Sequence, residues 1–316
     1  MSEQNFDKTS KIKVESMKIG YPCINLSLGK KTISTFRLSS YSEDNLIKAV
    51  NYNLSVLEEI LRFNIQHNFL FFRISSDIIP FASHPTCKFD WQSYFKNDLF
   101  RIGRIVKENK IRISMHPDQF VLLNSPNEEI VRNGIREINY QGSFLNAMNL
   151  DTTAKIQIHV GGVYNDKITS LNRFIENYNT LLSDDARSRL VIENDDYRFS
   201  LKDCLKIHDK THVPILLDVF HHECMTEGLS ISNAMESTCN TWKNDKDGVM
   251  MIDYSSQEPN SRKGKHASTL DEVKFKNFIT STIDFSYDLM LEIKDKEKSA
   301  FRSQEILDQI SNFTLK

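Results

Sequence analysis

The length, composition and charge of this chain exclude several classes of protein. Its 316 residues are 40% hydrophobic, which is enough for a large buried core, and its formal net charge of −2 gives no overall basic signature of nucleic-acid binding. Five cysteines without a Cys-x-x-Cys pair argue against a disulfide framework and a thiolate zinc site, and no run reaches the roughly 18 apolar residues of a membrane span. We therefore expect a cytoplasmic protein with no membrane partner.

Short apolar runs alternate with longer amphipathic segments from residue 18 onward. The preceding residues, 1–16, are polar and charged without an apolar period, which predicts a flexible N-terminal extension. No low-complexity linker divides the rest, so residues 17–316 are expected to form one domain.

Strands and helices are predicted to alternate along this domain. The predicted strands are 18–22, 69–74, 111–115, 155–160, 189–192, 215–217, 248–254 and 287–293. Each is followed by a predicted helix, at 42–61, 91–109, 128–149, 170–182, 200–209, 231–239, 271–280 and 297–313.

This alternation determines the expected fold class. Repeated strand–helix units of this length are typical of an α/β protein with a parallel sheet. The Gly-x-Gly-x-x-Gly fingerprint of a dinucleotide-binding sheet is absent after the first strand. The pattern therefore favours a single (β/α)8 TIM barrel over an open doubly wound sheet.

Histidines and carboxylates follow the predicted strands at their carboxyl ends. Barrel enzymes carry their chemistry at this end, so side chains from separate strands can converge on one mouth. Taken singly, a histidine beside a proline is an ordinary loop residue, and a strand-end acid is often a helix cap. Their recurrence on consecutive strands predicts metal binding, because charged groups in a barrel mouth are costly unless they are paired or coordinated. The candidate metal ligands are His84, His116, Glu193, Asp218, His221, Asp253, His266 and Glu292.

The number of candidates indicates more than one ion. A single catalytic zinc needs about three protein ligands, so this set suffices for two or three divalent ions, with Glu193 and Glu292 as bridging carboxylates. Mixed histidine and carboxylate ligands suit manganese or zinc, and the residues do not decide between them. Such multi-metal sites suit phosphodiester hydrolysis, in which ions activate water and hold the phosphoryl and leaving oxygens.

The segment 216–222 illustrates the alternatives that the residues leave open. Asp218 could be a metal ligand together with His221, or it could be only the cap of a following helix. His222 stays ambiguous for the same reason, and so do Asp195 and Asp196 after the fifth strand. Arg73 and Ser114 are expected to hold phosphates that flank the reacting one.

Several motifs of the chain resemble the UV damage endonuclease family. The resemblance runs in order from about residue 18 to 300, and Phe81-Ala82-Ser83-His84-Pro85 is its most specific part. The other matching segments are Gly20-Tyr21-Pro22-Cys23 with Asn25-Leu26, Arg73-Ile74, Ser114-Met115-His116-Pro117 with Gln119, His159-Val160-Gly161-Gly162-Val163-Tyr164, Glu193-Asn194-Asp195, Asp218 with His221-His222, Ser256-Gln257 and Leu291-Glu292-Ile293-Lys294-Asp295-Lys296-Glu297.

The resemblance implies an activity and roles for individual residues. It implies a TIM barrel that binds damaged double-stranded DNA and incises the backbone immediately 5′ of a UV photoproduct, leaving a 3′-hydroxyl and a 5′-phosphate, without a small-molecule organic cofactor. His159 would join the metal cluster as a ligand or phosphate contact, and Glu193 and Glu292 would partly hold the attacking hydroxide. The cluster residues that the resemblance carries over are His84, His116, Glu193, Asp218, His221, His266 and Glu292. The residues that would probe the lesion are Tyr21, Asn25, Gln119 and Phe120. An amide beside an aromatic wedge can enter a base stack that damage has already weakened.

Two positions depart from the family pattern. Well-known members have tyrosine where Phe120 stands, so the ring is retained and its hydroxyl is lost; the plain alternative for Phe120 is core packing. Some members carry Lys-x-His on the seventh strand, where this chain has Met251-Ile252-Asp253. Asp253 can still coordinate a metal ion, whereas Met251 cannot replace a lysine, so we expect metal preference and pH optimum to differ.

Two other functions compete with the nuclease. A metal-dependent sugar isomerase or epimerase on the same barrel type would explain the near-neutral net charge, but it needs fewer histidines and no Gln119–Phe120 loop. A non-catalytic damage-binding protein would bind lesion-containing DNA without metal. Steep salt dependence of DNA binding would separate a nuclease from an isomerase, because phosphate contacts release counterions.

Overall fold

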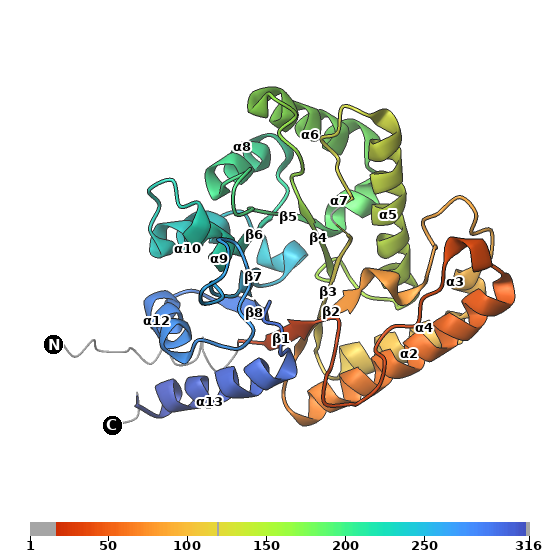
Figure 1. The fold of residues 1–316 in the computed structure, drawn as a ribbon, viewed down its shortest axis with the longest axis horizontal. Coiled ribbons are helices and arrows are strands. Elements are labelled where there is room, and N and C mark those ends of the chain that lie inside the picture. The colour runs from red at the N-terminus through yellow and green to blue at the C-terminus, as the bar shows by residue number, and fades with distance from the viewer. Residues whose placement is uncertain (1–16, 119, 314–316) are drawn as a thin grey trace.

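A closed ring of parallel strands forms the centre of the protein in its computed structural model, which describes residues 17–118 and 120–313 (Figure 1). Each strand pairs with its sequence neighbours, and β8 pairs with β1, so the order around the barrel follows the chain. The predicted (β/α)8 TIM barrel is confirmed. The predicted extension at 1–16 lies outside the described residues. The strands are β1 (Ile19–Pro22), β2 (Phe71–Ser75), β3 (Arg112–His116), β4 (Lys155–His159), β5 (Leu190–Glu193), β6 (Ile215–Asp218), β7 (Met250–Tyr254) and β8 (Tyr287–Leu291).

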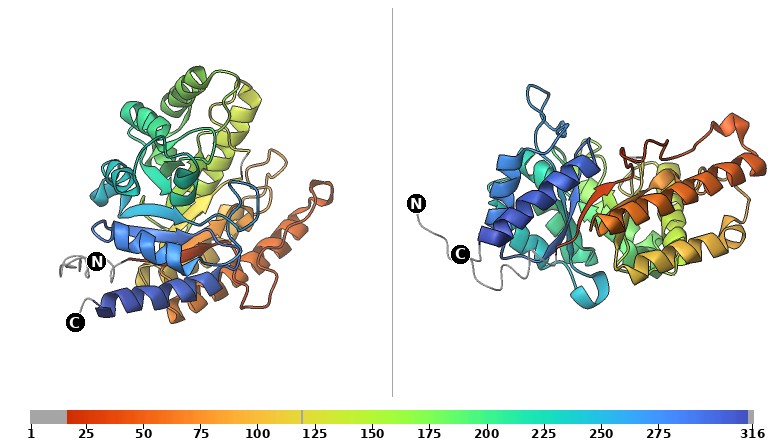
Figure 2. Two further views of the ribbon diagram at one scale, coloured as in Figure 1. Left: turned by 60° about the vertical axis from the view of Figure 1, so that its left-hand side comes forward. Right: turned by 90° about the horizontal axis from the view of Figure 1, so that it is seen from below.

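Helices surround this ring on its outer side (Figure 2). The longest, α2, runs beside α4, and the right-hand view in Figure 2 shows this pair extending beyond the barrel. Two 3₁₀ turns, η1 (Leu38–Ser40) and η2 (Ser76–Ile78), flank α2 and β2. The helices are α2 (Glu43–Gln66), α3 (Trp91–Tyr94), α4 (Lys96–Glu108), α5 (Glu128–Ala147), α6 (Lys167–Leu181), α7 (Asp184–Arg189), α8 (Leu201–Thr211), α9 (Val219–Cys224), α10 (Ile231–Cys239), α11 (Asn244–Asp247), α12 (Glu272–Thr282) and α13 (Glu297–Phe313).

The strands are short apolar runs because both of their faces are buried. Ile215, Leu216 and Leu217 of β6 have no exposed surface, as a parallel strand between the barrel interior and a layer of helices requires. Where the apolar run stops, a polar side chain reaches the mouth of the barrel. This is why strand ends read from the sequence locate the site.

Polar residues cap the amino-terminal ends of predicted helices. Ser42 accepts a hydrogen bond from the Asn45 amide at the start of α2, and Ser200 forms a capping box with Asp203 at the start of α8. Asp166 caps α6, which begins at Lys167, three residues before its predicted start.

The helix prediction was wrong in two respects: one predicted helix is two helices, and three short helices were missed. The single helix expected over 91–109 is two helices, because Phe95 adopts φ −95° and ψ 14° between α3 and α4. The short helices α7, α9 and α11 were not predicted, since segments of four to six residues are too short to show a helical period.

Buried ion pairs close the amino-terminal end of the barrel, opposite the mouth. The Lys155 ammonium, without exposed surface, donates to the Asp247 carboxylate at 2.7 Å and to the Ser188 carbonyl at 2.8 Å. Burial lowers the pKa of Lys155 to about 8, against the opposing effect of Asp247, so the ammonium is protonated at neutral pH. Arg112 lies 3.4 Å from the Asp288 carboxylate in the same layer. At this end of a barrel such contacts stabilise the fold.

None of the helices in the described part of the chain combines the length and the apolar character that crossing a membrane would require.

Candidate metal centre at the mouth of the barrel

Four neighbouring strands each end in a potential metal ligand. His116, His159, Glu193 and Asp218 are the last residues of β3, β4, β5 and β6. Strand register then places His159 opposite Glu193 and Asp218 opposite Asp253. Because parallel strands end at the same rim, these side chains meet at the mouth, as their positions in the sequence predict.

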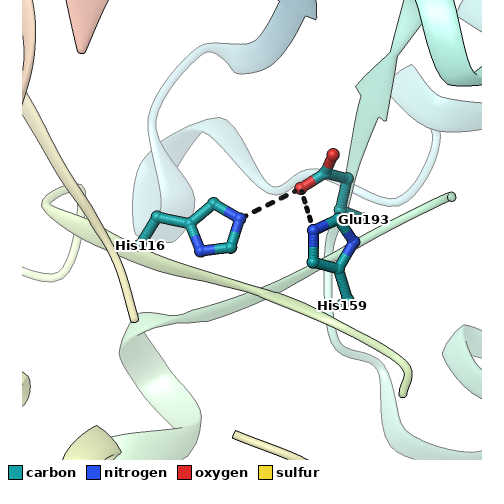
Figure 3. A group of neighbouring side chains, drawn as sticks. All are labelled: His116, His159 and Glu193. Carbon is teal, nitrogen blue, oxygen red and sulfur yellow. Dashed lines mark ion pairs between the residues drawn. The ribbon is translucent and has the colours of Figure 1, made fainter. Parts of the chain in front are cut away.

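Glu193 lies between two groups of histidines. His116 Nε2 is 3.5 Å and His159 Nε2 3.9 Å from the same carboxylate oxygen, Oε2, and Figure 3 shows both rings directed at it. The other oxygen, Oε1, is 3.1 Å from His221 Nδ1. Glu193 is 1% exposed, so it is a buried carboxylate whose two oxygens face different ligand groups. This is the geometry that a bridging carboxylate requires.

The first ligand group consists of His116, His159 and Glu193, whose ligand atoms lie within 4.8 Å of one another. The second consists of Asp218, His221 and His266 and meets the same criterion. Their imidazole rings form an arc around the mouth, with centroid separations of 5.2 Å between His116 and His159, 6.1 Å between His159 and His221, and 5.4 Å between His221 and His266.

Asp218 has the capping role that the sequence allowed, and its geometry leaves the predicted role as a metal ligand open. Its Oδ1 accepts the His221 backbone amide at 2.6 Å and so caps α9. Its Oδ2 is buried without a hydrogen-bond partner. The cap fixes the carboxylate and leaves one oxygen to bind a ligand. His222 points elsewhere: it is 2% exposed, and its Nε2 lies 3.1 Å from the Leu229 carbonyl.

The electrostatics of the mouth favour ionised carboxylates beside imidazoles. Burial alone would raise the pKa of Glu193, but His159, His116 and His221 hold it well below its ordinary value. Burial raises the pKa of Asp218 to about 6, with Glu193 adding to the shift and His221 opposing it. Burial would lower the pKa of His221, yet Asp218 and Glu193 raise it to about 11. His221 is therefore protonated at neutral pH where no metal ion replaces the proton.

The donor set fits divalent transition-metal ions. Imidazole nitrogens and carboxylate oxygens are ligands for manganese and zinc. Besides Asp218 Oδ2, the buried Nδ1 of His159 has no hydrogen-bond partner. Such unpaired buried atoms are unfavourable unless a ligand satisfies them. The first and second ligand groups could each hold one ion.

A buried arginine lies below these groups and makes carboxylate contacts that the sequence did not predict. Arg73 of β2 is 2% exposed, and its Nη2 donates to Asp253 Oδ1 at 2.8 Å, to Asp253 Oδ2 at 2.7 Å and to Gln157 Oε1 at 2.6 Å. Its Nη1 donates to Glu292. Arg73 thus contacts carboxylates inside the barrel, and it also lines the cavity at the mouth, so its predicted contact with flanking phosphates stays a prediction. A charged residue inside an otherwise apolar strand is the signal that could have revealed the carboxylate contacts.

Asp253 and Glu292 lie at the mouth in different surroundings. Asp253 falls within 4.8 Å of Glu193 and Asp218 in a third possible ligand group, although Arg73 and Gln157 occupy its oxygens. Glu292 directly follows β8, and its Oε2 is 3.8 Å from His266 Nδ1. Among the described residues it is in none of the three groups.

His84 is set apart from the other predicted ligands. Its side chain is exposed, and its Nδ1 accepts a hydrogen bond from the Thr86 amide at 3.1 Å. It lines a neighbouring cavity of about 440 Å³ with Glu137, and it is absent from the three ligand groups of the described residues. Its role as a ligand stays a prediction. Asp195, left open before, accepts the Tyr197 and Phe199 amides at 3.0 Å and orders its own loop.

The predicted lesion-probing residues differ in exposure. Phe120 is 72% exposed, so it does not pack in the core, and it lines both the cavity of about 620 Å³ at the mouth and the cavity beside His84. Tyr21 and Asn25 are buried: Asn25 Nδ2 donates to the Tyr21 hydroxyl at 2.7 Å, which donates to Asn64 Oδ1 at 2.5 Å. In this structure they pack the first βα unit. Gln119 lies outside the described residues.

Sequence comparisons match this chain to UV damage endonucleases. A family model described as UV-endonuclease UvdE matches residues 17–315. The UV DNA damage endonuclease of Clostridium perfringens (strain 13 / Type A) is 38% identical over 296 residues, covering 93% of this chain and 72% of that protein. The UV DNA damage endonuclease of Bacillus cereus (strain G9842) is 30% identical over 284 residues, covering 89% of this chain and 88% of that protein.

Solved structures extend the comparison to the fold. The crystal structure of SacUVDE superposes with a TM-score of 0.89 at 45% identity, covering 93% of this chain and 99% of that one. Endonuclease IV from Thermus thermophilus has a TM-score of 0.55 at 12% identity, covering 80% of this chain and 94% of that one, which shows a shared barrel alone.

Proposed function

Because this chain belongs to the UV-endonuclease UvdE family, we propose that it is a metal-dependent endonuclease that nicks damaged duplex DNA immediately 5′ of UV photoproducts, leaving a 3′-hydroxyl and a 5′-phosphate. The family places it among DNA repair nucleases. The observation that supports metal-dependent hydrolysis is the position of Glu193 between two groups of histidines. A cytoplasmic location is part of the same proposal.

The first and second ligand groups would hold the divalent ions, manganese or zinc. Ions bound there supply Lewis-acid stabilisation of phosphoryl oxygens and a nucleophile at neutral pH. Glu193 would hold the two groups in a fixed position relative to each other, since each of its oxygens faces one of them. Burial lowers the pKa of His159, so its imidazole is neutral at pH 7 and can coordinate or accept a proton.

The residues around the mouth would position the DNA. Phe120 is exposed at its edge and can insert beside unstacked bases, which costs least where the lesion has weakened pairing. Lys294 and Lys296 line the same cavity and supply positive charge near the backbone phosphates. Lesion contact by Gln119, Tyr21 and Asn25 is part of the proposal as well, although the last two would have to leave their buried positions.

The rival sugar epimerase has weaker support. D-psicose 3-epimerase from Clostridium cellulolyticum H10 superposes with a TM-score of 0.52 at 14% identity, covering 82% of this chain and 93% of that one, which shows the fold alone. The matching family and relatives are endonucleases.

A direct test uses end-labelled duplexes, one UV-irradiated and one undamaged, incubated with the protein and manganese or zinc. We expect a lesion-dependent nick on the 5′ side of the photoproduct, and the product should be a substrate for a polymerase because it ends in a 3′-hydroxyl. A chelator should abolish the nick. Equal cleavage of both duplexes, or none with either metal, would contradict the proposal.

Metal affinity should depend on pH in a defined direction. An ion at the second ligand group must replace the proton that His221 carries below a pKa of about 11, while Asp218 is ionised above about pH 6. The affinity should therefore rise about tenfold per pH unit from about pH 6 to about pH 8. Titration calorimetry with manganese in buffers of different ionisation enthalpy measures the proton released. His67→Gln, an exposed histidine after α2, should keep the slope. A pH-independent affinity would show that His221 is not a ligand.

Removal of the Phe120 ring should lower discrimination between damaged and undamaged DNA. Stacking of a base on an aromatic ring contributes about 1–3 kcal/mol, so Phe120→Ala should weaken binding of the lesion duplex by roughly 5- to 150-fold and leave binding of undamaged DNA almost unchanged. Phe100→Ala removes another exposed ring, on α4, and is the matched control. Fluorescence anisotropy with both duplexes gives the two affinities; an equal loss for both would refute a lesion-specific role.

A further inference from the structure

The Asp253 carboxylate is already satisfied by protein donors. It has no exposed surface, and both of its oxygens accept from Arg73 Nη2, at 2.8 and 2.7 Å. Its Oδ2 also accepts from Gln157 Nε2 at 2.7 Å. Asp218 on β6 is paired with Asp253 in the strand register, but one of its oxygens, Oδ2, has no hydrogen-bond partner. Two aspartates on adjacent strands therefore offer unequal binding capacity.

Arg73 brings a permanent positive charge to the floor of the mouth. A guanidinium does not lose its proton in a protein, and this one contacts Asp253 and Glu292 while it is 2% exposed. A divalent ion bound to Asp253 would therefore stand close to a fixed cation and would have to displace hydrogen bonds from Arg73 and Gln157. The first and second ligand groups do not include Asp253, and they carry a smaller part of this cost, namely the single hydrogen bond that Glu193 Oε2 accepts from Gln157.

Gln157 connects this floor to the bridging carboxylate. Its Oε1 accepts from Arg73 at 2.6 Å, which fixes the orientation of the amide. Its Nε2 then donates to Asp253 and to Glu193 Oε2. Arg73 thus positions Glu193 through Gln157 and contacts Glu292 directly. One layer below Asp253 on β7, Met251 is buried and has no nitrogen or oxygen ligand atom in its side chain.

We propose that Arg73 supplies one of the positive charges of this centre as part of the protein, with Asp253 as its counter-ion, so that the mouth binds two divalent ions per chain and not three. One ion belongs to His116, His159 and Glu193, and the other to Asp218, His221 and His266. Gln157 is a positioning residue that holds Glu193 between them. The inference rests on the proposed function only for its premise that the mouth binds metal.

The test counts metal ions without measuring incision. The full-length protein is loaded with manganese, freed of excess by dialysis and analysed by elemental mass spectrometry. We expect two ions per chain in the wild type and still two in Asp253→Asn. The matched control, Asp218→Asn, makes the same change in the register partner and should reduce the count to one. Arg73→Met removes the fixed cation and frees Asp253, and the count should rise to three, whereas Arg73→Lys keeps the charge and should leave it at two.

The possible outcomes separate this inference from the proposed function. Three ions in the wild type, or loss of one ion in Asp253→Asn, would overturn the role assigned to Arg73 while leaving a metal-dependent nuclease intact. No bound ion in the wild type would contradict the metal dependence itself. If Arg73→Met does not fold, the wild type and the two aspartate variants still decide the question.

Discussion

Glu193→Gln should abolish incision while leaving the barrel folded. The substitution keeps the shape of the side chain and removes the negative charge that faces both histidine groups. Metal ions contribute several kcal/mol of transition-state stabilisation in hydrolytic sites, and a loss of about 4 kcal/mol lowers the rate about a thousandfold. Single-turnover cleavage of a UV-irradiated duplex at saturating manganese measures the effect, and circular dichroism verifies the fold.

A matched control variant shows whether the loss of incision is specific to Glu193 or follows the replacement of any glutamate. Glu272 is exposed on α12, where it pairs with Arg302, and Glu272→Gln should cleave at the wild-type rate. A folded Glu193→Gln protein with more than about a tenth of wild-type activity would contradict the bridging role, since a loss of that size is typical of residues outside the ligand set. Metal content measured on the same samples shows whether ions are lost or only misplaced.

Lys155→Met should destabilise the protein by about 3–5 kcal/mol, because it leaves the Asp247 carboxylate buried without its cation. Asp247 is 3% exposed, so water cannot replace the lost partner. The expected loss is a large fraction of the 5–15 kcal/mol that is typical of folded proteins. Urea denaturation followed by tryptophan fluorescence gives the free energy of unfolding, and the folded fraction should still cleave DNA, since this pair is at the closed end of the barrel.

Two further variants test the cause of that loss. Lys155→Met combined with Asp247→Asn removes both charges and should recover most of the stability. Lys30→Met breaks the exposed pair with Glu59 and should cost less than about 1 kcal/mol. If the exposed and the buried variants lose the same free energy, burial of the Lys155–Asp247 pair is not the reason for the effect.

The strand ends could be located from the sequence because each apolar run stops where its strand leaves the core. β6 shows this: Leu217 is fully buried, and Asp218 after it caps α9 at the mouth. The same rule places His116 and His159 at the ends of the adjacent strands β3 and β4, and His221 joins them from α9, the helix that Asp218 caps. Their distances from Glu193 depend on barrel register, which a single sequence does not specify.

The contacts at the floor of the site were missed because its residues lie within strands and not at their ends. Arg73 and Gln157 alternate with apolar neighbours in β2 and β4, so the period-two pattern predicts only which face of the strand each side chain is on. Which carboxylate an inward arginine meets is decided across the barrel: its partner Asp253 is 180 residues away in the chain. Tyr21 and Asn25 show the converse, since their local sequence does not indicate that both are buried in a hydrogen-bonded chain that ends at Asn64 of α2.

Closure of the barrel between its first and last strands also affects how the protein is made. Lys18 donates its amide to Asp288 Oδ1 at 3.1 Å across 270 residues of chain, next to the register that joins Ile19 to Leu289. At about 5–20 residues per second, a ribosome needs roughly 15–55 seconds to make that length of chain. During this time the edge of β1 has no partner from β8, and the mouth lacks Glu292. We therefore expect a nascent chain stalled before β8 to be protease-sensitive and inactive, and to need protection of its open strand edge until synthesis reaches the last strand.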